Sequence, residues 1–157
     1  MARLAKTLCV LKEIRMLTKY LFIAGCIPFL VLGALHTLYT IADTFHPKKL
    51  APYKPEVAAA MKATTLALTK ETDMWRAWVG FNISHGVGLL FFSCIYLYLA
   101  VAHTVMLSES IVLLSGAPLV ALIYLILSKK YWFSIPVVGS SLGLLCFVSG
   151  TLSAIYA

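Results

Sequence analysis

Long apolar segments alternate with short polar ones along the chain. Four apolar runs stand out, at about residues 20–42, 76–102, 110–127 and 132–156. A helix needs about 20 mostly apolar residues to cross the hydrocarbon core of a bilayer, and lipid offers no partner for unpaired backbone groups. The pattern therefore predicts an all-α integral membrane protein, a four-helix bundle that forms a single domain over residues 1–157.

Two polar segments flank the first of these runs. Residues 1–19 interleave basic side chains with leucine, isoleucine and valine, a basic amphipathic pattern that suits the headgroup layer. Residues 43–75 form a long loop, in which Pro55 followed by glutamate is a typical helix start. We expect an interfacial helix from Val57 to Lys70, lying along the membrane surface.

Composition supports the membrane assignment and narrows the partners. Hydrophobic residues make up 61% of the chain and charged residues 12%, whereas a soluble domain averages about 25% charged residues. The net charge of +7 comes from lysine and arginine that flank the apolar runs. Such charges suit anionic headgroups, so we expect membrane lipids and no nucleic acid as partners.

Polar side chains recur at helical spacing within the first two apolar runs. Such residues are costly in hydrocarbon and normally face the interior of a bundle. Antiparallel neighbouring helices would bring both sets to one level, with an ion pair between Asp43 and Arg76 at its mouth. The candidate ligand-binding residues are His36, Thr40, Asp43, Arg76, Trp78, Asn82 and His85.

Small residues predict where helices approach closely. Gly80, Ser84 and Gly88 form a stripe at steps of four, which we expect to pack against the first span. Gly139 and Gly143 form a G-x-x-x-G pattern in the fourth span, which packs either inside the bundle or in a homodimer.

Several functions fit this polar layer. The leading prediction is a pocket for a lipid-like or quinone-like small molecule between the first two spans. The alternatives are an accessory subunit of a larger membrane complex, in which the polar residues only join helices, and a small membrane enzyme or b-type haem protein with His36 and His85 as axial ligands. No catalytic motif, zinc helix, P-loop or dinucleotide fingerprint is present in the sequence, so no catalytic residue or cofactor is assigned. A binding protein should keep an open cavity beside the two histidines, whereas a packing subunit should have a filled layer and an exposed face of small residues.

One segment carries a resemblance. The run from Trp75 to Gly86, WRAWVGFNISHG, together with Gly33-Ala34-Leu35-His36-Thr37, resembles a group of small four-span bacterial membrane proteins of unassigned function. The resemblance covers about residues 20–100. It implies a location in the bacterial inner membrane and groups His36, Asn82 and His85 as one unit, without implying a reaction or a ligand.

Overall fold

The computed structural model describes the backbone of residues 2–156 and the side chains of residues 10–156. Over this range the chain forms six helices and no strand: α1 (Ala2–Phe45), α2 (Pro55–Ala63), α3 (Met74–Ala102), α4 (Thr104–Glu109), α5 (Ile111–Tyr131) and α6 (Ser134–Ile155). Helices α1, α3, α5 and α6 are long and apolar enough to cross a membrane. The predicted all-α fold with four membrane-spanning helices is confirmed, and the chain fits an integral membrane protein.

Helix α1 joins the predicted amphipathic segment and the first span into one helix of 44 residues. At 1.5 Å per residue it is about 66 Å long, twice the thickness of the hydrocarbon core of about 30 Å. Part of α1 therefore extends beyond the hydrocarbon. The side chains of Arg3 and Lys6, which belong to the predicted amphipathic pattern, lie outside the described residues.

Helix α2 is shorter than predicted. It begins at Pro55 as expected but ends at Ala63, and Thr64 is already extended at φ −118° and ψ 143°. The N–H of Met74 donates to the Thr64 carbonyl at 2.9 Å, and Thr65 forms an isolated β-bridge with Asp73. The prediction of helix as far as Lys70 is wrong, because two successive β-branched residues favour extended backbone here.

The connection between the second and third spans contains a helix that the pattern did not predict. Helix α4 occupies Thr104–Glu109, and Ser110 then caps α5, where its hydroxyl accepts from the Leu113 N–H at 3.4 Å. Helix α5 continues to Tyr131 rather than ending at residue 127. Its last turn holds Lys129 and Lys130, whose charges suit the negative end of a helix.

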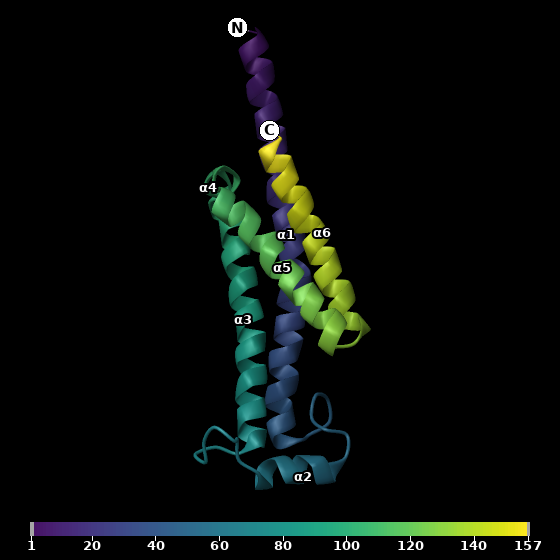
Figure 1. The fold of residues 1–157 in the computed structure, drawn as a ribbon. Coiled ribbons are helices and arrows are strands. Elements are labelled where there is room, and N and C mark those ends of the chain that lie inside the picture. The colour runs from purple at the N-terminus through teal and green to yellow at the C-terminus, as the bar shows by residue number, and fades with distance from the viewer. Residues whose placement is uncertain (1, 157) are drawn as a thin grey trace. The chain divides into compact units, whose positions relative to one another are not determined.

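The chain divides into two compact units. The loop unit is residues 31–90, and the aromatic unit is residues 1–30 with 91–157. Within the loop unit, α2 lies across the ends of α1 and α3 (Figure 1). The single domain expected from the sequence stays a prediction.

The aromatic unit has a core of rings from four helices. Phe147 of α6 lies 5.4 Å from Phe22 and 6.1 Å from Phe29, measured between ring centroids. Phe92, Tyr96 and Tyr124 complete the ring cluster. Helix α5 also packs along α6. A hydrogen bond of 2.7 Å from the Thr151 hydroxyl to the Leu114 carbonyl joins these two helices.

Candidate functional site

The polar layer of the loop unit is built around a hydrogen bond between α1 and α3. His36 Nε2 lies 3.0 Å from Asn82 Oδ1, and Asn82 Nδ2 donates to the Trp78 carbonyl at 2.8 Å. The second bond fixes the orientation of the amide, so its oxygen faces the imidazole. Because an amide oxygen only accepts, His36 Nε2 carries the hydrogen and donates it.

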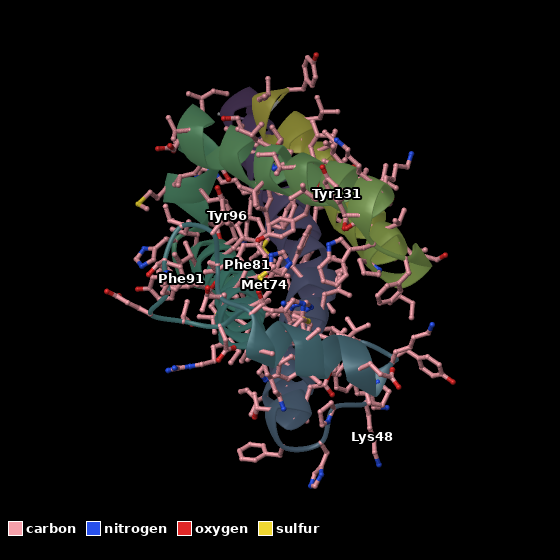
Figure 2. All side chains as sticks on the ribbon, turned by 60° about the horizontal axis from the view of Figure 1, so that its bottom comes forward. Lys48, Met74, Phe81, Phe91, Tyr96 and Tyr131 are labelled. Atoms are coloured by element: carbon pink, nitrogen blue, oxygen red, sulfur yellow. The ribbon has the colours of Figure 1, made fainter. Side chains whose placement is uncertain are left out.

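The two histidines contact each other. Their ring centroids lie 5.1 Å apart at an interplanar angle of 64°, an edge-to-face arrangement. Phe81 is stacked with His85 at 6.4 Å and 22°. Both imidazoles are half-buried, whereas Phe81, which is labelled in Figure 2, is 70% exposed.

The helix backbones approach closely beside this layer, at Gly33 and Gly86. A Cβ on Gly33 would lie 2.9 Å from the Cβ of Leu89, and one on Gly86 would lie 3.1 Å from the Gly33 carbonyl. It would also collide with Thr37 Oγ1, which is buried and has no hydrogen-bond partner among the described residues. The hydroxyl thus lies close to Gly86, at a position that a side chain there would occupy.

The predicted packing of the Gly80, Ser84 and Gly88 stripe against the first span is wrong. A Cβ on Gly80 or Gly88 would meet nothing within 4 Å, and Ser84 is exposed. The Ser84 hydroxyl donates to the Phe81 carbonyl of its own helix at 2.8 Å. Helix α3 has small residues on two faces, and the face that also bears Asn82 is the one that contacts α1.

Asp43 organises the loop after α1. Its side chain is fully buried, and its two carboxylate oxygens accept four successive backbone N–H groups. Oδ1 accepts from Lys48 and Lys49, each at 2.9 Å, and Oδ2 accepts from Leu50 at 2.6 Å and Ala51 at 2.7 Å. The Lys48 side chain itself points away from the ribbon (Figure 2).

The remaining site residues have contacts of other kinds. The expected ion pair between Asp43 and Arg76 is not formed. The ion pair found among residues 10–156 joins Arg15 to Glu109, and the Arg76 side chain is exposed. Thr40 is buried, and its hydroxyl donates to the His36 carbonyl at 2.8 Å. The Trp78 ring stacks on Trp75 at 5.2 Å. Among the seven predicted residues, His36 meets both Asn82 and His85 through side chains.

This arrangement does not fit a haem held by His36 and His85. Axial ligands stand on opposite faces of a porphyrin, whereas these two rings are in edge-to-face contact, and His36 Nε2 is hydrogen-bonded to Asn82. Within residues 10–156 there is also no group of three or more histidine, cysteine, aspartate or glutamate side chains that could hold a metal ion. The layer is a set of direct contacts between the chain's own groups.

Comparison with known proteins gives no further identification. No protein-family model, curated protein or solved structure matches this chain. The resemblance in the segment from Trp75 to Gly86 therefore stays a prediction.

Sequence reasoning missed two features of this region. Thr37 and Gly86 lie in the two segments that carry the resemblance, but nothing in the sequence pattern distinguishes Gly86 from Gly80 or Gly88. The sequence pattern places Asp43 among the ligand-binding residues, whereas its carboxylate binds backbone N–H groups of the following loop. Pro47, a turn-forming residue four positions later, was the signal for that loop.

Proposed function

We propose that this protein is an accessory subunit that packs against transmembrane helices of a larger membrane complex. The observation that carries the proposal is the set of direct contacts in the polar layer between α1 and α3. His36 bonds to Asn82, its ring touches His85, and the backbones approach at Gly86. Polar groups that bond to each other in this way join two helices of one chain.

The outer face of α3 adds support. Gly80 and Gly88 face open space, with exposed Ser84 between them, and the neighbouring side chains of Phe81 and Val87 are 70% and 48% exposed. A row of small residues between larger ones is the surface on which a second transmembrane helix can bring its backbone close. The partner in this proposal is a helix of another subunit, in the bacterial inner membrane that the sequence resemblance implies.

Site-specific photo-crosslinking in the native membrane tests this proposal. A benzoylphenylalanine replaces Ser84 on the small-residue face, and in the control it replaces Leu38, a 61% exposed residue of α1. We expect a stoichiometric protein crosslink from position 84 but not from position 38. The crosslinked peptide of the partner, identified by mass spectrometry, should come from an apolar segment of about 20 residues.

A blocking variant makes the same experiment decisive. Gly88→Leu adds a side chain where nothing lies within 4 Å, so the fold of the chain itself should be unchanged. The crosslink from position 84 should then disappear. Lipid adducts alone at position 84, equal protein crosslinks at both positions, or a crosslink to a second copy of this chain would contradict the proposal. The last outcome would favour a homo-oligomer, for which Gly143 is less suited because it already contacts Phe29 of its own chain.

A second candidate keeps the predicted lipid-like or quinone-like ligand but moves it to the outside of the layer. It is favoured by the stacked pair of His85 and exposed Phe81, which offers an aromatic surface beside an imidazole. Native mass spectrometry of the detergent-purified protein should then detect an added mass of several hundred daltons. His85→Ala should remove this adduct and His103→Ala should retain it. Equal retention in both variants would exclude this candidate.

A further inference from the structure

A hollow with a basic wall lies along the first part of α1 in the aromatic unit. It encloses about 320 Å³. Its lining residues are Leu11, Lys12, Arg15, Met16, Lys19 and Thr104. Lys12, Arg15 and Lys19 follow one another at helical spacings of three and four, so three basic side chains on one face of α1 line the same hollow.

The basic side chains that line this hollow are only partly neutralised by acidic side chains. Arg15 forms an ion pair of 3.1 Å with Glu109, in which both side chains are largely exposed at 46% and 64%. Lys19 donates to the Val101 carbonyl at 3.4 Å, near the end of α3. A carbonyl carries no net charge, so the residues that line the hollow carry three positive charges and one of them, Arg15, is paired with a carboxylate; Glu13 follows Lys12 in the sequence but does not line the hollow. An anion is therefore attracted to this space.

The cations lie at the depth of lipid headgroups. The long apolar run of α1 begins at Tyr20. At 1.5 Å per residue, Lys19, Arg15 and Lys12 lie about 2, 8 and 12 Å beyond that point along the helix. The headgroup layer on each side of a bilayer is about 5–8 Å thick, so Lys19 and Arg15 lie within it and Lys12 lies just outside it.

The other walls distinguish a lipid from a soluble anion. Leu11 and Met16 line the hollow beside the cations. A free phosphate is hydrated on all sides and gains nothing from apolar walls, whereas the glycerol and upper acyl carbons of a phospholipid do.

We propose that this hollow binds the phosphate headgroup of an anionic phospholipid. Lys12, Arg15 and Lys19 bind the phosphate and the anionic headgroup, while Leu11 and Met16 contact the adjoining carbons. The site is separate from the packing face of α3 and goes beyond the function proposed above. It would fix one lipid at this end of α1.

Native mass spectrometry of the full chain in detergent, titrated with phosphatidylglycerol or phosphatidylcholine, tests the site. We expect one phosphatidylglycerol to be retained at least tenfold more tightly than phosphatidylcholine. The variant Lys12→Gln/Arg15→Gln/Lys19→Gln should abolish this preference. The control Lys48→Gln/Lys54→Gln/Lys70→Gln removes the same charge from exposed loop residues and should retain the preference within twofold.

Two further measurements keep the outcome unambiguous. If the triple variant does not fold, Lys12→Gln alone, at an exposed residue, should weaken phosphatidylglycerol retention about fivefold. Inorganic phosphate should not displace the lipid, even at about 10 mM, which is far above the lipid concentration. Equal loss in the triple variant and its control, no effect of Lys12→Gln, or displacement by phosphate would each overturn the proposal, the last in favour of a soluble phosphate ligand.

Discussion

The loop unit and the aromatic unit join their helices in different ways. In the loop unit α1 and α3 meet backbone to backbone at Gly33 and Gly86, and a hydrogen bond between His36 and Asn82 lies alongside. In the aromatic unit the glycines lie first of all against rings, although a Cβ on Gly143 would also lie 3.1 Å from the Gly25 carbonyl. A Cβ on Gly143 would collide with the ring of Phe29, and one on Gly25 would lie 2.7 Å from the ring of Phe147.

This difference predicts how each unit tolerates change. Lipid tails are as apolar as leucine, so helices in a membrane associate through van der Waals fit and polar bonds rather than through the hydrophobic effect. In the loop unit the fit depends on the Thr37 hydroxyl, the Cβ of Leu89 and several backbone atoms, which have little room to move away. In the aromatic unit it is spread over several rings, each with more than one neighbour. Substitutions should therefore lower the free energy of unfolding more in the loop unit than in the aromatic unit.

The largest effect is expected at Asp43. Asp43→Ala removes the acceptor of four backbone N–H groups, and a hydrogen bond to a charged group contributes about 1.5–3 kcal/mol. Because the freed groups gain water, we expect a net loss of about 4 kcal/mol in the free energy of unfolding of the loop. Hydrogen exchange of the amides of residues 48–51 measures this directly, as a loss of their protection.

Asp73 offers the matched control for this prediction. Its carboxylate accepts one backbone N–H, from Arg76 at 2.8 Å, at the start of α3. Asp73→Ala should cost about 1 kcal/mol, the usual value for a lost helix cap. If amides 48–51 exchanged equally fast in the Asp43→Ala and Asp73→Ala variants, the carboxylate of Asp43 would not be what holds the loop.

The second largest effect is expected at Gly86. Gly86→Ala places a methyl group against Thr37 and the Gly33 carbonyl, and we expect a cost of about 2–3 kcal/mol from overpacking. Gly88→Ala meets open space and should stabilise α3 by about 0.5–1 kcal/mol, since alanine is the better helix former. Unfolding by SDS titration measures both. Thr37→Ala added to Gly86→Ala should restore part of the loss, and similar stabilities for the two glycine variants would remove the contrast between the faces of α3.

The same contrast marks the limit of what the sequence predicts. The length of the apolar runs was sufficient to predict four membrane-spanning helices, because few other backbone structures can cross a lipid bilayer. The spacing of His36, Asn82 and His85 was sufficient to bring them to one level. It could not select Gly86 over the stripe at Gly80 and Gly88, since that choice depends on which face of α3 meets α1.

Local backbone preferences and contacts between distant residues account for the other differences between the predictions and the structure. The helix pattern after Pro55 continued to Lys70, but Thr64 and Thr65 take extended backbone and Thr65 pairs with Asp73. The role of Asp43 depends on where residues 48–51 fold back, which neither charge nor periodicity records. The basic hollow on α1 likewise depends on Thr104, 85 positions away from Lys19 in the chain.

A smaller effect is expected in the aromatic unit, at Phe147. Truncating a large aromatic residue costs about 3–5 kcal/mol in a soluble core, but lipid is nearly as favourable for an exposed ring. We therefore expect about 2 kcal/mol for Phe147→Ala in SDS titration, although this ring contacts Phe22, Phe29, Phe92 and Tyr96. Phe147→Leu should cost less than half as much, because neighbouring rings can close the gap. A cost for Phe147→Ala above that of Gly86→Ala would reverse the comparison between the units.

The smallest effect is expected for the hydrogen bond that the site is built around. Polar bonds between helices in membranes contribute about 0.6 kcal/mol on average and at most about 1.7 kcal/mol. His36→Ala and Asn82→Ala, combined in a double-mutant cycle, should therefore give a coupling energy of about 1 kcal/mol. The reference pair His103 and Tyr98, whose side chains also bond at 2.9 Å but are exposed, should couple by less than half of that. A coupling near zero for His36 and Asn82 would leave helix packing, including the close approach at Gly86, as the support of the contact between α1 and α3, and would remove the polar contacts from the grounds for the accessory-subunit proposal.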